Sequence, residues 1–172
     1  MGGQTIVCPM PNMEYISVEH QRAISERFKA ASIIVVAFCV SVGVFALLGR
    51  LIEPPETLLH SERLNSIIPP VVIVLAMGVI VLRRVWMSAM VMRLASRTGV
   101  AATLNRLVQM TVVCAAFSEI VAVVGFYFYF LTGNYRYSLI LCLVSLLLLF
   151  YTAFPRRGEW ERAVAAAANA GA

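Results

Sequence analysis

The sequence predicts an all-α integral membrane protein, a four-helix bundle made of two antiparallel hairpins. Of its 172 residues, 60% are hydrophobic and only 13% are charged, a balance typical of membrane-spanning chains. A helix needs roughly 17 to 25 mainly apolar residues to cross a hydrocarbon core about 30 Å thick. Four segments with few or no charges meet that length, and they are residues 30–49, 66–82, 107–131 and 137–154.

These spans divide the chain into three parts: a cytoplasmic arm with an interfacial helix at 1–29, a transmembrane domain at 30–154, and a cytoplasmic tail at 155–172. The arm lacks the long apolar stretch of a secretory signal, so we expect the first span to act as an uncleaved anchor. Trp160 in the tail is expected to lie at the depth of the lipid headgroups. The arm, loops and tail are each too short to bury a core of their own.

Short signals place the ends of the later spans. Pro69 and Pro70 open the second span, which is acceptable because the first turn of a helix has unpaired backbone donors anyway. Gly99 is placed to end an interfacial helix that follows the second span. The Gly133-Asn134 turn is so short that the third and fourth spans must form an antiparallel hairpin.

The basic residues predict the orientation. Eleven lysines and arginines fall in the arm, the middle loop and the tail, and three fall in the two other loops. By the positive-inside rule, both termini are expected in the cytoplasm. This distribution explains the net charge of +5 without a nucleic-acid partner. The eleven are Arg22, Arg27, Lys29, Arg83, Arg84, Arg93, Arg97, Arg106, Arg156, Arg157 and Arg162, and the three are Arg50, Arg63 and Arg136.

The sequence offers few parts for catalysis. It has no aspartate, no Gly-rich phosphate loop, and no GxSxG or HExxH motif. Its two histidines, His20 and His60, are expected on opposite sides of the membrane. The four cysteines follow no CxxC spacing, so we interpret them as small packing residues. We therefore predict a protein that is not an enzyme and has no metal and no cofactor.

Glu119 is the one acidic or basic residue within 107–131 and lies near its midpoint. A charged acid at the centre of a membrane helix costs about 2.5 to 3.5 kcal/mol, so we expect it to be protonated unless a cation lies nearby. Three roles fit: a neutral acid that helps pack helices, a group that meets a partner's arginine, cofactor or lipid, or a carrier of protons or ions. The candidate hydrogen-bond partners are Ser41, Ser145, Thr111 and Gln109.

A seam of small side chains runs along the same span beside Glu119. Its members recur at heptad spacing, which lets a neighbouring helix approach closely. We interpret this span as the helix through which the protein docks onto other membrane subunits. The seam consists of Thr111, Ala115, Ser118, Ala122 and Gly125.

The third span ends in five consecutive aromatic residues. Such a cluster is typical of the aromatic belt at a membrane interface. A face that binds a quinone, a pigment or a lipid tail is the alternative. The five residues are Phe126, Tyr127, Phe128, Tyr129 and Phe130.

The run Ala116-Phe117-Ser118-Glu119, with Gly125 six residues after the acid, resembles the carboxylate helix of the c subunit of rotary ATP synthases. The resemblance covers this one helix and implies that Glu119 is a proton-binding carboxylate. The chain also looks like small uncharacterised bacterial four-span membrane proteins that share this helix and an arginine-rich end such as residues 155–157. That resemblance implies the inner membrane of a bacterium.

The leading hypothesis is a non-enzymatic accessory or scaffold subunit of a larger membrane complex, docking through the third span, with lipids and other subunits as its partners. The first alternative is a proton- or ion-conducting protein that uses Glu119. The second is a binder of lipid, quinone or pigment that uses the aromatic cluster.

Overall fold

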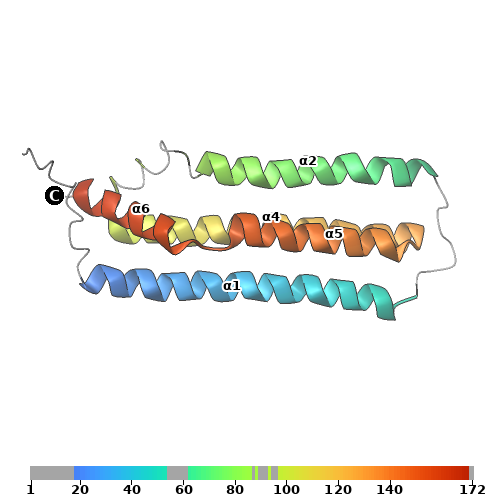
Figure 1. The fold of residues 1–172 in the computed structure, drawn as a ribbon, viewed down its shortest axis with the longest axis horizontal. Coiled ribbons are helices and arrows are strands. Elements are labelled where there is room, and N and C mark those ends of the chain that lie inside the picture. The colour runs from blue at the N-terminus through green and yellow to red at the C-terminus, as the bar shows by residue number, and fades with distance from the viewer. Residues whose placement is uncertain (1–17, 54–61, 87, 89–92, 94–96, 171–172) are drawn as a thin grey trace, which may run out of the picture.

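The computed structural model describes residues 18–53, 62–86, 88, 93 and 97–170. Within these residues the chain is helical and contains no strand. The elements are α1 (Val18–Leu51), α2 (Glu62–Trp86), α4 (Val100–Thr132), α5 (Tyr135–Leu148), the π-helical turn η1 (Leu149–Ala153) and α6 (Arg157–Ala170) (Figure 1).

Four helical stretches are long and apolar enough to cross a membrane: Gln21–Leu51, Pro69–Trp86, Val100–Thr132 and Tyr135–Ala168. Three of the four predicted spans lie inside them, and the second, 66–82, lies within α2 but begins three residues before Pro69. Within the described residues this confirms the all-α class and the four membrane-length helices. The start of α1, the end of α2, the start of α4 and all of α6 gather at one end of the bundle, here called the basic end (Figure 1). The side of the membrane that this end faces stays a prediction.

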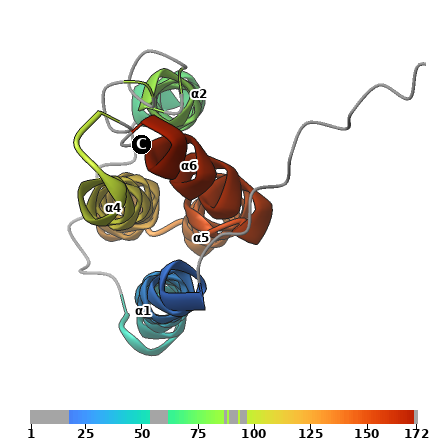
Figure 2. The same ribbon diagram turned by 90° about the vertical axis from the view of Figure 1, so that its left-hand side faces the viewer.

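The α4–α5 hairpin forms the middle layer, with α1 on one side and α2 on the other (Figure 2). Within the described residues α1 and α2 do not contact each other. Of the two predicted hairpins, therefore, only α4–α5 packs as one. The difference follows from loop length, because the link between α1 and α2 lets them dock on opposite faces, whereas residues 133–134 hold α4 against α5.

The α4–α5 turn has the chemistry that its sequence predicts. Gly133 adopts a left-handed conformation (φ 67°), and its backbone N–H donates to the Tyr129 carbonyl at 2.8 Å. Asn134 then caps α5, its side-chain oxygen accepting from the Arg136 N–H at 3.2 Å. Two residues thus reverse the chain.

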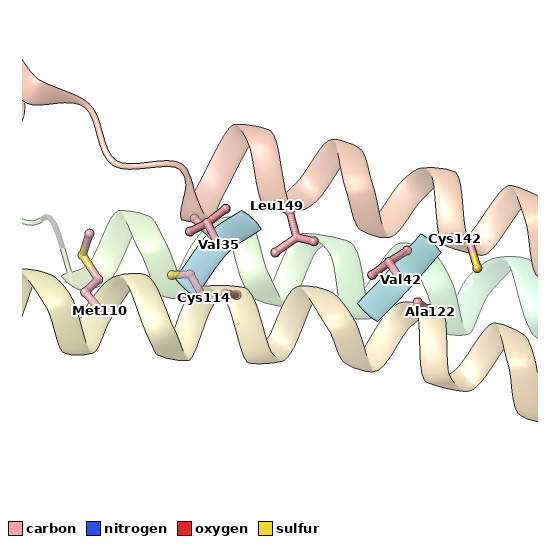
Figure 3. Packing of buried hydrophobic residues seen from close by; sticks show 9 residues of the cluster. Val35, Val42, Met110, Cys114, Ala122, Cys142 and Leu149 are labelled. Atoms are coloured by element: carbon pink, nitrogen blue, oxygen red, sulfur yellow. The ribbon is translucent and has the colours of Figure 1, made fainter. Parts of the chain in front are cut away.

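The main apolar core lies where α1, α4 and α5 meet, and it continues into η1 (Figure 3). Val35 and Val42 of α1 face Cys114 and Ala122 of α4. Cys114 and Cys142 are buried in this core and Cys39 packs against it half-buried, as expected for packing residues. Cys8 lies outside the described residues. The other members of the core are Met110, Ala115, Cys142, Leu149 and Ala153.

α1 is longer than a bilayer requires. Its 34 residues extend about 51 Å, against a hydrocarbon thickness of about 30 Å. The helix continues through residues 29–30 without a break, so the segment expected to be a separate interfacial helix is the first part of α1. Its placement at the cytoplasmic interface stays a prediction, and the part before residue 18 lies outside the described residues.

The extra length of α1 helps to build a second core at the basic end. Trp160 of α6 is only 2% exposed, and its ring meets Phe28 of α1 edge to face at 5.8 Å. Trp160 therefore packs inside the protein and not against lipid, and its headgroup depth stays a prediction. The arm and the tail contribute to this core only together with the start of α4, which agrees with the expectation that neither segment buries a core of its own. The buried members are Ile24, Ala31, Leu104, Leu107, Trp160, Ala163 and Val164.

Candidate functional site

Glu119 lies in the middle of α4 and faces α1. Its side chain is half-buried, and the Ser41 hydroxyl of α1 donates a hydrogen bond to Glu119 Oε1. Ser41 is also near the middle of its predicted span, so both polar groups lie far from the span ends. Of the four hydrogen-bond partners that the sequence suggested, the structure selects Ser41.

The other three candidates are engaged elsewhere or point outward. The Ser145 hydroxyl of α5 donates to the Ser118 carbonyl at 2.7 Å. The Thr111 hydroxyl donates to the Leu107 carbonyl of its own helix at 3.0 Å. Gln109 is exposed. None of these three side chains, all within the described residues, has a recorded hydrogen bond to Glu119.

Within the described part of the chain, Glu119 forms no ion pair, because the recorded ion pairs join other residues. Its partner is a neutral hydroxyl. A protonated carboxyl can accept a hydrogen bond from Ser41 on its carbonyl oxygen and still carry its own proton. The remaining exposure leaves part of this group open to the bilayer. The Ser41 hydroxyl therefore gives one oxygen of this acid a hydrogen-bond partner without a counter-ion.

The small-residue seam of α4 is filled by the chain's own helices. Thr111, Ala115, Ser118, Ala122 and Gly125 are all buried, the first four being at most 2% exposed. They pack among α1, α5 and η1. Docking of another protein through this seam stays a prediction, and it would require one of these helices to move away.

The α5 side of the seam combines close approach with hydrogen bonds. A Cβ atom added to Gly125 would lie 2.6 Å from the Leu141 Cβ, a distance that real side chains do not tolerate. Seven residues earlier, about two turns away, the Ser118 hydroxyl donates to the Cys114 carbonyl at 2.8 Å and lies 3.4 Å from the Thr152 hydroxyl of η1. The absence of a side chain at position 125 therefore sets the α4–α5 spacing.

The aromatic run at the end of α4 is divided between faces of the helix. Tyr129 is buried, and its hydroxyl donates to the Ile52 carbonyl just after α1, at 2.7 Å. Phe126 meets Phe130 edge to face at 4.9 Å and lies 5.6 Å from Phe45 of α1. Tyr127 is 62% exposed. The five rings do not form one flat surface, and their role as an interfacial belt or ligand face stays a prediction.

A polar cluster at the basic end was missed by the sequence reasoning. Arg83 of α2 donates to the Tyr151 carbonyl, and its Nη2 lies 3.2 Å from Glu159 Oε2 of α6. Proline has no N–H, so Pro155 cannot donate the α-helical hydrogen bond that the Tyr151 carbonyl would otherwise accept. The Tyr-x-x-x-Pro spacing signals an orphan carbonyl. It does not show which of the many arginines supplies the donor.

Among the described residues, no group of three or more His, Cys, Asp or Glu side chains could hold a metal ion. The fold and the site together define a helical bundle with four membrane-length helices and one acid at mid-span. Comparisons of the chain with protein-family models, with curated proteins and with solved structures found no match.

Proposed function

We propose that this protein is a non-enzymatic accessory or scaffold subunit of a larger complex in a bacterial inner membrane, with both termini in the cytoplasm. The observation that carries the proposal is the outer face of α2. This helix packs on α4 and α5 through one side only, formed by Val72, Leu75, Ala76 and Ile80. Its opposite side is exposed.

The exposed side of α2 carries a regular seam, here called the α2 seam. Its residues follow heptad spacing and are β-branched except for one glycine. β-branched side chains have few rotamers, so they lose little freedom when a second helix packs on them. The glycine lets the two backbones approach closely. The α2 seam consists of Ile67, Val71, Val74, Gly78, Val81 and Val85.

The difference in burial between the α4 seam and the α2 seam supports this assignment. Because the α4 seam is filled by α1 and α5, it supplies rigidity within the chain. The α2 seam offers spacing and side chains suited to a helix of another subunit. We therefore assign the docking surface of the proposed subunit to α2 in place of the third span.

Two glycines provide a matched test. Gly78 in the α2 seam and Gly43 on α1 are both exposed, and a Cβ added to either would meet nothing within 4 Å. We expect Gly78→Leu to release at least about nine-tenths of the subunits that co-purify in mild detergent, because a leucine keeps the helices apart. Gly43→Leu should retain them. Native mass spectrometry of protein extracted from its own membrane measures both, and unchanged partner masses in Gly78→Leu would contradict the proposal.

Proton or ion conduction is the second candidate, and the observation that favours it is the half-buried state of Glu119. An acid held by a hydroxyl at mid-span, yet partly open to the bilayer, can exchange a proton without a permanent counter-ion. The resemblance of this helix to the proton-binding helix of the rotary c subunit points the same way.

Chemical modification and flux test this candidate together. If Glu119 carries protons, a hydrophobic carbodiimide should modify it in a pH-dependent way, and Glu119→Gln should abolish proton flux in proteoliposomes. Glu161→Gln is the control, because Glu161 lies in α6 outside the span and pairs with Arg157 at 2.9 Å. An inert Glu119 together with normal flux in Glu119→Gln would exclude conduction through this residue.

A further inference from the structure

The cluster at the basic end holds more positive than negative charge. Glu159 is shared by two guanidinium groups, with Arg83 at 3.2 Å and Arg156 at 3.8 Å. One carboxylate therefore faces two cations, which leaves one positive charge unmatched. Arg156 also lies over the exposed ring of Tyr151, with its Cζ atom 6.0 Å from the ring centroid. These four residues are here called the arginine cluster.

The arginine cluster retains unused hydrogen-bonding capacity. A guanidinium group carries five N–H donors, and the recorded contacts of Arg83 use two of its nitrogens, one on the Tyr151 carbonyl and one on Glu159. The Arg156 side chain is 56% exposed. Arg156 can therefore bind a further anionic partner without giving up Glu159, whereas Arg83, whose side chain is 13% exposed, contributes mainly its positive charge.

The position of the cluster along the bundle indicates where such a partner would come from. η1 ends the last apolar span, and α6 begins the charged segment that follows it. On the outer surface of this junction, the rings of Phe150 and Phe154 stack at 6.1 Å and are exposed. Aromatic rings beside arginines at the end of a span are typical of the boundary between acyl chains and headgroups. A ligand here meets cations on one side and apolar rings on the other.

We propose that the arginine cluster binds the phosphate of an anionic phospholipid, whose acyl chains lie along Phe150 and Phe154. Arginine suits a phosphate because its planar fork can make two parallel hydrogen bonds. An anionic lipid is favoured over a zwitterionic one, because the arm, middle loop and tail together carry eleven basic residues against five glutamates. This inference does not depend on the proposed subunit function.

The test measures lipid retention on the full-length chain. The protein is delipidated in neutral detergent, supplied with phosphatidylglycerol or with phosphatidylcholine of the same acyl chains, and analysed by native mass spectrometry. We expect the wild type to retain phosphatidylglycerol about fivefold better, the effect expected of one arginine near a membrane surface. Arg156→Gln should remove this preference. Arg157→Gln should keep it, because Arg157 pairs with Glu161 away from the cluster.

Two further arms keep the proposal falsifiable. Glu159→Gln removes the competing carboxylate and should increase phosphatidylglycerol retention, so a decrease would count against the site. Equal retention of the two lipids by the wild type would contradict the proposal. If Arg157→Gln loses as much of the phosphatidylglycerol preference as Arg156→Gln, the preference comes from general surface charge and the proposed site is wrong. If inorganic phosphate displaces phosphatidylglycerol at comparable concentration, the site recognises free phosphate and the lipid assignment is wrong. Circular dichroism verifies that each variant is folded.

Discussion

Ser41 of α1 donates a hydrogen bond to Glu119 of α4, and both residues lie near the middle of their predicted spans, 30–49 and 107–131. The two residues are 78 positions apart in the sequence, so this contact joins the first span to the third. In the apolar centre of a bilayer, an unpaired carboxyl costs several kcal/mol, on the order of the penalty for any unsatisfied polar group there. The hydroxyl of Ser41 lowers that cost and fixes the rotation of α1 against α4.

Removing this hydroxyl should loosen the α1–α4 contact. We expect Ser41→Ala to reduce the free energy of unfolding by about 0.6 kcal/mol, and by no more than about 1.7 kcal/mol, the average and the maximum measured for hydrogen bonds between membrane helices. Denaturation in mixed micelles followed by circular dichroism measures the change. Ser32→Ala is the matched control, because Ser32 donates to the Phe28 carbonyl of its own helix at 2.9 Å. Equal stability of the two variants would show that the Ser41–Glu119 bond contributes nothing.

The sequence alone located Glu119 and named Ser41 among four possible partners, and it could go no further. A membrane acid is conspicuous because it is costly, whereas its partner depends on how each helix is rotated about its axis. Hydropathy does not give that rotation, because nearly every residue of 30–49 is apolar. The same ambiguity left the α4 seam open to two interpretations, packing within the chain or docking onto a partner.

Gly125 and Leu141 provide a steric test of the α4–α5 spacing. The Cβ of an alanine at position 125 would lie 2.6 Å from the Leu141 Cβ, so the two backbones would have to separate. We expect Gly125→Ala to cost about 1 to 3 kcal/mol of stability, as overpacking does in tight cores. Gly78→Ala should have little effect, because nothing lies within 4 Å of its added Cβ.

A double variant checks that Leu141 is the cause of this loss. Leu141→Gly removes the whole side chain that an alanine at position 125 would press against, because the Leu141 Cβ, Cδ1 and Cγ atoms all lie within 3.3 Å of the added Cβ. The combined variant should therefore lose less stability than the sum of the two single changes. Strict additivity would mean that the clash is relieved elsewhere.

Two tyrosines of α4 allow a buried hydroxyl to be compared with an exposed one, since Tyr129 is buried and Tyr127 is exposed. Tyr129→Phe removes the hydrogen bond to the Ile52 carbonyl, so we expect a loss of about 0.5 to 1.5 kcal/mol. Hydrogen exchange should accelerate at the end of α1, near residues 48–52. Tyr127→Phe should leave both quantities unchanged, because Tyr127 is mostly exposed. Similar effects of the two changes would contradict the assignment of a structural role to Tyr129.

The features that the sequence did not predict are contacts between distant ends of the chain. Residues 18–31 and 157–170 have too few apolar residues to predict a core separately, and their pairing becomes visible only when α1, α4 and α6 are brought to one end. Arg83 was counted as one of eleven orientation charges. Its specific role depends on the orphan carbonyl created by Pro155 and on the position of Glu159 in space.

Trp160 tests whether the second core at the basic end folds independently of the spans. Trp160→Ala removes the largest buried side chain of that core and its edge-to-face contact with Phe28, so we expect a loss of about 3 to 5 kcal/mol from this region. Because the main core of α1, α4 and α5 does not include Trp160, the loss should be local. Hydrogen exchange and limited proteolysis should detect a detached α6, with cleavage within residues 157–170, while the four spans stay protected.

Arg162→Ala on the exposed side of α6 is the control and should leave the helix docked. If Trp160→Ala instead unfolds the spans together with α6, the basic end and the membrane bundle form one cooperative unit.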